Sequence, residues 1–175
     1  MYIGNEPLRV GDHDIALTVN DFWRWSFSDL SDYSTRAAFS EFLVASSLGL
    51  AADNTSRLRR SHDLLWAGGL GIKIGVRTAA YIQSGEAEHP DHIVFNVSNE
   101  PTCDAYVFCV LKAMMQEESP LNTDLWDFYA LRALAFGKSM PEQGFITFPA
   151  LLRHKPVWSD YYGIAEAVQR AAAAS

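Results

Sequence analysis

Charged side chains in the first half of the chain have types and spacings that could do chemistry. Glu41 has small apolar residues three and four positions away on either side, and Asp63 follows further along the chain. Lys73 and Arg77 then alternate with apolar residues. Carboxylates can hold a divalent cation, whereas lysine and arginine bind anions such as phosphate. These four residues indicate a polar site for a metal ion or for a phosphate group, provided that the fold brings them together.

Each of these residues also has an ordinary structural explanation. Asp63 could cap a turn at the end of a strand, and Glu41 could be a charge on the surface of a helix. Lys73 and Arg77 could be exposed strand residues, because simple alternation would put both on one face. Gly75, between them, could mark a bulge or the close approach of another segment.

Other polar motifs in the sequence are weaker. No two of the five histidines lie four apart on a predicted helix, so the sequence has no zinc signature. The run Asp12-His13-Asp14 is more typical of a turn than of a metal site. The run Ser61-His62-Asp63 is not a catalytic triad, because consecutive side chains of a strand diverge.

A helix and a β-hairpin would have to position the four charged residues. The apolar spacing from Ser34 to Leu48 predicts a helix, with Ser34 as its cap and Gly49 just beyond its end. Strands are predicted for residues 62–66 and 72–78, joined by a glycine-rich turn. In the second strand Ile74 and Val76 would face one way, and Lys73, Gly75 and Arg77 the other.

The rest of the chain predicts an α/β fold with a mixed central sheet flanked by helices. Residues 92–97 and 105–112 are apolar enough for central strands. Residues 125–134 fit a strand or a helix, 145–148 a short strand, and 163–174 a closing helix. Residues 1–33 have no clean period, and we expect a short strand and a loop whose aromatic side chains cover the core. These aromatics are Phe22, Trp23, Trp25 and Phe27.

The order of these elements and charges resembles the PD-(D/E)XK superfamily of restriction-endonuclease-like proteins. That superfamily has a glutamate on a first helix, an aspartate in a strand, and an acidic residue, any residue and lysine on the next strand. Glu41, Asp63 and the 72–83 segment match this order over about residues 35–112, and Gln83 resembles a glutamine that often follows the motif. The resemblance implies a restriction-endonuclease-like core with Glu41, Asp63, Arg77 and Gln83 at the catalytic positions.

The sequence departs from the superfamily at its last motif. Gly75 stands where a metal-binding carboxylate is expected, and Arg77 stands where a lysine is expected. With one carboxylate fewer, we expect no cofactor or only weakly bound Mg²⁺ on Asp63 and Glu41. Arginine does not readily exchange a proton, so water activation in the superfamily's manner is in doubt. The face instead favours an anion, with four candidate anion-binding residues: Arg59, Arg60, Lys73 and Arg77.

Composition limits the setting of this site. The 175 residues fit one domain, 1–175. The chain has no long apolar run and no signal-peptide pattern at its start, which predicts a cytoplasmic protein without a membrane partner. A net charge of -7 argues against indiscriminate binding to nucleic acids. Cys103 and Cys109 are expected to be reduced, with Cys109 in the core.

Three functions remain open from the sequence. The leading hypothesis is a divergent nuclease-fold protein that binds DNA or RNA, or regulates, with weak or no metal-dependent nuclease activity. The second is an active Mg²⁺-dependent nuclease in which another carboxylate replaces the missing ligand. The third is a small-molecule enzyme or binding protein on the same scaffold, and whether the chain is an enzyme stays open. Its pocket would use aromatic residues among Trp23, Trp25, Trp66, Tyr81 and Trp158.

Overall fold

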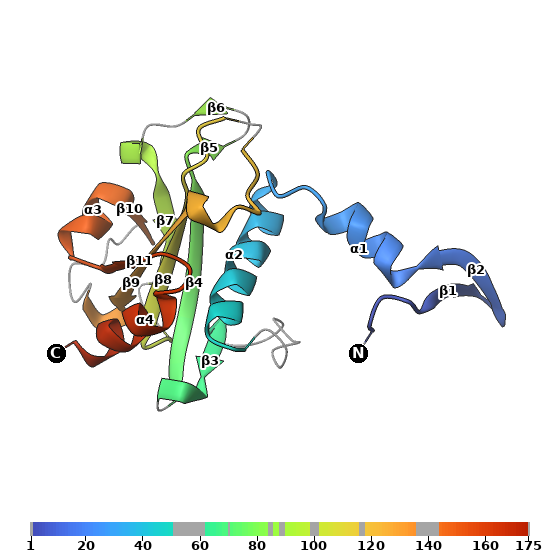
Figure 1. Cartoon of the computed structure of the whole chain (residues 1–175), viewed down its shortest axis with the longest axis horizontal. Helices are drawn as coiled ribbons and strands as arrows, with labels where there is room; N and C mark the ends of the chain where they lie inside the picture. The colour runs from blue at the N-terminus through green and yellow to red at the C-terminus, as the bar shows by residue number, and fades with distance from the viewer. Residues whose placement is uncertain are drawn as a thin grey trace.

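A five-stranded mixed sheet forms the centre of the molecule (Figure 1). The computed structural model describes residues 2–50, 62–69, 71–83, 86–87, 90–98, 102–115, 118–135 and 144–174, with the backbone alone described at 83, 86 and 87. The strand order is β11-β9-β8-β4-β3, and β4 and β8 are parallel while the other neighbours are antiparallel. The strands are β3 (Leu64–Trp66), β4 (Ile72–Ala80), β8 (Ala105–Leu111), β9 (Trp126–Arg132) and β11 (Val157–Ser159).

Each face of the sheet buries its own core. On one face, α2 (Tyr33–Ser47) packs on β4, and α4 (Ile164–Ala173) packs on β9 and β11, over a shared core that includes Ile74 and Val76. On the other face, α3 (Phe148–Arg153) and the segment around Phe95 cover β8 and β9. The predicted α/β fold with a mixed sheet between helices is therefore confirmed. Alternation along the strands divides their side chains between the two cores.

Strand β8 is central, as its unbroken apolar sequence predicts. All of its residues are buried, because it has strand neighbours on both edges and a core on both faces. Residues 126–132 form a strand rather than a helix, and β11 was not predicted. These two strands continue the sheet beyond β8.

The prediction of a central strand at residues 92–97 is wrong. A 3₁₀ turn, η2 (Pro90–His92), is followed by β7 (Val94–Asn96). Among the described strands, β7 pairs with β10 (Phe145–Thr147) alone, in a separate two-stranded sheet. Only Phe95 of β7 is buried, while Val94 and Asn96 are exposed. An apolar run of this length can thus serve a strand that buries one face alone.

The helix and the hairpin of the predicted site are present with shifted ends. Helix α2 is capped by Asp32, whose carboxylate accepts from the backbone N–H groups of Ser34 and Thr35. Gly49 follows the helix with φ of 73°, which suits glycine. Strands β3 and β4 are joined through a short 3₁₀ turn, η1 (Ala67–Gly69), as the glycine-rich sequence predicts.

Three smaller elements complete the part of the chain that the structure describes. Strands β5 (Ile82–Gln83) and β6 (Glu86–Ala87) pair with each other, and η3 (Thr123–Leu125) precedes β9. Within the described residues, no helix has the length and apolar character needed to cross a membrane.

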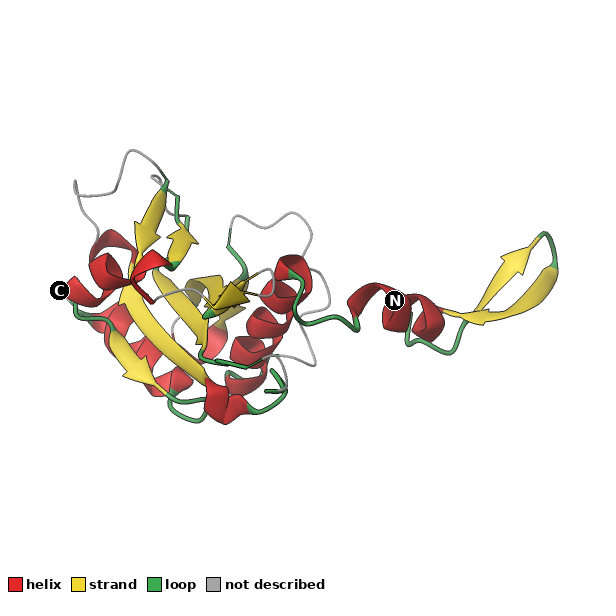
Figure 2. Cartoon of the chain, turned by 90° about the horizontal axis from the view of Figure 1, so that it is seen from above, coloured by secondary structure: helices red, strands yellow, loops and turns green. Residues whose placement is uncertain are grey.

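The N-terminal segment forms an arm that extends away from the sheet (Figures 1 and 2). The arm, residues 2–27, consists of the hairpin β1 (Pro7–Val10) and β2 (His13–Thr18) and the helix α1 (Val19–Phe27). The expectation that its aromatics cover the core is wrong, since Phe22 is 50% and Trp25 83% exposed. The arm makes hydrogen bonds within itself, and after the arm the chain runs to the sheet, where α2 begins.

Candidate functional site

A cleft of about 440 Å³ lies beside the edge of β4. Strand β3 pairs with β4 only from Ile72 to Ile74, so the edge of β4 from Val76 onward is left uncovered by β3. Helix α2 forms one wall, and the end of β7 with the residues after it forms the other. The lining residues are Tyr33, Ala37, Ser40, Glu41, Asp63, Val76, Arg77, Thr78, Asn96, Val97 and Ser98.

Asp63 joins the cleft to the hairpin. Its backbone N–H donates to the carbonyl of Ile74 at 3.0 Å. Its carboxylate oxygen Oδ2 accepts from the N–H of Val76 at 2.7 Å and from Nη1 of Arg77 at 2.9 Å. The predicted convergence of Asp63 and Arg77 is confirmed. The carboxylate therefore continues the β3–β4 pairing with a side chain and fixes a cation beside it.

Arg77 is held by three acceptors and one ring. Besides Asp63, Nη1 donates to the carbonyl of Val76 at 2.6 Å, and Nε donates to the carbonyl of Asn96 at 2.8 Å. Its guanidinium carbon lies 5.2 Å from the centre of the Tyr106 ring, within range of a cation–π contact. Contacts through Nε, through Nη1 and with the ring therefore fix the guanidinium in position at the wall of the cleft.

Gly75 and Lys73 do not join this cleft. A Cβ atom on Gly75 would lie 2.8 Å from ring carbons of Tyr106 and 3.1 Å from Sγ of Cys103, so the ring fills the space that a side chain would need. Lys73 is exposed, and its backbone N–H donates to Asp104. The expectation that Lys73, Gly75 and Arg77 form one face of the cleft is wrong except for Arg77. Lys73 and Arg77 point to the same side of β4 but are about 13 Å apart along the strand.

The charge of the described lining is formally -1, from the carboxylates of Glu41 and Asp63 and the guanidinium of Arg77. Because Lys73 is not in the lining, these residues do not give the excess of positive charge expected of a face that favours an anion. Glu41 is partly buried on α2 and lines the cleft as expected. Within the described part of the chain, no three His, Cys, Asp or Glu side chains gather as a metal site would require.

Thr78, Tyr33 and Asn96 line the cleft and were missed from the sequence. Thr78 is 5% exposed, and its hydroxyl has no hydrogen-bond partner among the described residues. The position of Thr78 at the uncovered edge of β4 could have been found only by knowing that β3 is short.

Cys103 and Tyr106, which pack against Gly75, are both uncharged at neutral pH. Burial raises the pKa of the Cys103 thiol, which therefore stays protonated and is a poor nucleophile. Burial also raises the pKa of Tyr106. Arg77 therefore packs against an uncharged ring, and the carboxylate of Asp63 balances its positive charge.

Several predicted site residues lie elsewhere or outside the described residues. Arg59 and Arg60 are outside them. Gln83 has its backbone in β5, and its side chain is not described. The aromatic residues considered for a pocket do not line the cleft. Trp23 and Trp25 belong to the arm, Trp66 is in the core, Tyr81 is partly buried on the other face, and Trp158 is exposed on β11.

Comparison of the chain with protein-family models, with curated proteins and with solved structures finds no match.

Proposed function

We propose that this protein is a divergent, restriction-endonuclease-like domain that binds the phosphates of DNA or RNA in the cleft without depending on a metal ion. The order of the elements supports this proposal: Glu41 is on the helix before the hairpin, Asp63 begins the hairpin, and Arg77 is on its second strand. These three residues line one cleft. The observation that carries the proposal is the fixed guanidinium of Arg77 against Asp63.

A guanidinium in this position takes the role that a divalent cation would have beside the carboxylate. Asp63 already shares Oδ2 with the Val76 N–H and with Arg77, so its charge is largely balanced. A metal ion bound to the same oxygen would have to displace one of them. Arginine offers planar donors to phosphate oxygens and does not shuttle protons at neutral pH, which favours binding over hydrolysis.

The proposed binding is modest and dependent on salt. Glu41 and Asp63 offset the charge of Arg77, so one fixed guanidinium cannot hold a polyanion strongly by itself. Arg59 and Arg60 precede Asp63 by four and three positions in the sequence and are part of the proposal. We expect no cofactor, or Mg²⁺ bound weakly by Glu41 and Asp63.

Fluorescence anisotropy with labelled single- and double-stranded DNA and with RNA tests this function. In the presence of a chelator, binding should appear at low salt and weaken as salt rises, by about one logarithmic unit of slope per phosphate contact. Arg77→Gln should weaken binding to every sequence by roughly tenfold, the equivalent of one charge-assisted contact. Lys73→Gln is the matched control, because it removes the same charge from the same strand outside the cleft lining.

The two alternatives give different results. The active nuclease is favoured by the presence of both Glu41 and Asp63 in one cleft, and it requires cleavage on addition of Mg²⁺ or Mn²⁺ and tight Mn²⁺ binding by calorimetry. A small-molecule site is favoured by the cleft volume, which lies within the range of ligand pockets. Absence of nucleic-acid binding at the lowest salt would reject our proposal and leave that site as the candidate.

A further inference from the structure

The N-terminal arm is well ordered by hydrogen bonds but has almost no core of its own. Thr18 and Asp21 form a reciprocal cap at the start of α1. The carboxylate of Glu6 accepts from the N–H groups of Ile3 and Gly4. Nevertheless, α1 has no buried residue, and every residue of β1 is exposed. The arm thus has a defined shape, while its apolar side chains are left in contact with solvent.

These apolar side chains gather on faces of the arm. On α1 the helical spacing places Val19, Phe22, Trp23 and Phe27 on one side. On the hairpin, the side chains of Arg9 and Asp14 pair on one face. By alternation, the side chains of Val10, Ile15 and Leu17 point to the other face. Val10 is 66% and Leu17 49% exposed. A two-stranded hairpin is marginal in water without such a face being covered, so the arm needs a partner surface.

The charge of the arm restricts what this partner can be. Its four carboxylates, against the two guanidinium groups of Arg9 and Arg24, give residues 2–27 a formal charge of -2. Nucleic-acid phosphates and anionic lipid surfaces attract positive segments, and neither suits this arm. A protein surface that is apolar and positively charged would complement it.

The body of this chain carries such a surface at the opposite edge of the sheet. A groove of about 370 Å³ lies between β9, β11, the end of α4 and the turn after α3. Leu134 and Val157 give it apolar walls, and Leu134 is 67% exposed. The groove also contains Arg132, Lys155 and Arg170. The carboxylate of Glu166 lies 3.9 Å from Arg170, with both side chains exposed, and no carboxylate is among the described lining residues of the groove.

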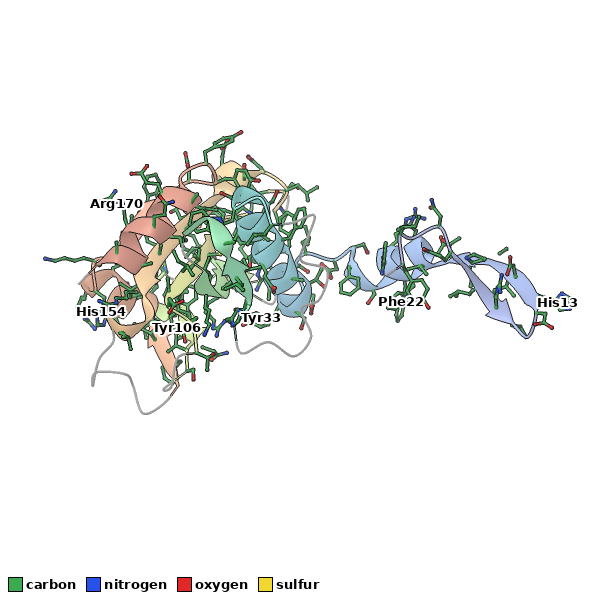
Figure 3. The ribbon with its side chains drawn as sticks, turned by 90° about the horizontal axis from the view of Figure 1, so that it is seen from below. His13, Phe22, Tyr33, Tyr106, His154 and Arg170 are labelled. Carbon is green, nitrogen blue, oxygen red and sulfur yellow. The ribbon has the colours of Figure 1, made fainter. Side chains whose placement is uncertain are left out.

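The arm cannot reach the groove of its own chain. In Figure 3 His13 and Phe22 of the arm lie at one end of the molecule, and His154 and Arg170 beside the groove lie at the other. The connection between α1 and α2 is short, from Ser28 to Asp32. Contact between these surfaces therefore has to join two molecules.

We propose that the arm of one copy of this chain packs into the groove of a second copy, in a head-to-tail contact. Phe22 and Phe27 on the apolar side of α1 are about half exposed, and their rings suit the apolar part of the groove. The acidic arm and the cations around the groove set the direction of the contact. Such a contact is heterologous, and it grows into a ring or a chain of molecules unless two copies exchange arms.

Two variants of the full chain, each defective in one surface, test the proposal. Phe22→Ser with Phe27→Ser removes two aromatic side chains from the apolar side of α1, and Leu134→Ser with Arg170→Glu alters the groove. All four side chains are exposed, so the fold should tolerate the changes, which circular dichroism can verify. Phe42→Ser, on the exposed side of α2, is the matched control for loss of an apolar surface group.

Light scattering coupled to size-exclusion chromatography over a concentration series gives the readout. The mass of the unmodified chain and of Phe42→Ser should rise with concentration, and each double variant alone should remain monomeric. Mixed in equal amounts, the two double variants should form a 1:1 complex that grows no further, because one intact arm meets one intact groove. A monomeric unmodified chain, self-association of the groove variant, or a mixture that stays monomeric would each overturn the proposal.

Discussion

The planar shape of one arginine sets the chemistry of the cleft. Arg77 meets the carboxylate of Asp63 and two backbone carbonyls with Nε and Nη1, while Tyr106 lies against its face. A lysine ammonium could not meet these acceptors together, because its donors leave from a single nitrogen. Arg77 therefore gives the cleft a fixed cation that does not readily exchange a proton.

Gly75 provides a direct test of how tightly this site is packed. Gly75→Ala would put a methyl group 2.8 Å from the Tyr106 ring, and that ring is 1% exposed and cannot swing into solvent. We expect a loss of about 1–3 kcal/mol in the free energy of unfolding, measured by urea denaturation. Tyr106→Leu in the same chain should recover part of this loss beyond the sum of the two single changes, because the smaller side chain makes room. Equal stability of Gly75→Ala and the unmodified chain would contradict the packing described for β4.

The shortness of β3 is the element-scale reason why a cleft exists. If β3 began several residues before Leu64, its backbone would pair with the edge of β4 at Val76 and would close the cleft. Instead, Asp63 satisfies the Val76 N–H with its side chain, and α2 and the end of β7 form walls on either side. The cleft thus depends on where one strand ends.

The start of α2 is capped by Asp32, whereas the sequence predicts Ser34 as the cap. Asp32→Ala removes the carboxylate that accepts from two N–H groups at the start of the helix, and we expect a loss of about 1 kcal/mol of stability. Ser34→Ala, at the position predicted as the cap, should change stability by no more than a few tenths of a kcal/mol. Thermal unfolding of both variants measures the difference. A reversed order of the two effects would show that Ser34 is the cap after all.

Local patterns predicted the elements whose signals are local. The helix at 34–48, the glycine-rich hairpin and the continuous apolar strand β8 follow from spacing, turn residues and run length. The convergence of Asp63 and Arg77 also followed, because a hairpin fixes which residues of its strands are neighbours. The separation of Lys73 from the cleft could not be predicted, since it depends on where the walls end.

Long-range packing decided the elements that the sequence did not predict. An apolar run such as 92–97 is equally compatible with a central strand and with one that buries a single face. Aromatic side chains are usually buried, so the sequence predicts that the aromatics of residues 22–27 cover the core, whereas they are exposed. Nothing in the local sequence indicates that the arm extends away from the sheet. Whether a segment packs on its own molecule is a property of the whole chain.

At the scale of the whole molecule, stability should fall at alkaline pH because of a thiol in the core. Cys109 is fully buried in the centre of β8, and this burial raises its pKa strongly. Below about pH 8.5, the ordinary pKa of a thiol, the folded and unfolded chains both keep the proton, so the contribution to stability is fully present. As the pH rises above that value, the unfolded thiol ionises while the folded one does not. The free energy of unfolding should then decrease by up to about 1.4 kcal/mol per pH unit from this group.

Urea denaturation from pH 7 to pH 10 under reducing conditions measures this dependence, with Cys109→Ala as the comparison. Other groups also titrate in this range, and burial raises the pKa of Cys103 as well, so the difference between the two chains is the informative quantity. At pH 7 the variant should be less stable, because it loses a buried sulfur atom. This deficit should shrink as the pH rises, since the alanine chain has no thiol that ionises on unfolding. A deficit that stays constant up to pH 10 would mean that the buried thiol does not govern the alkaline limb of stability.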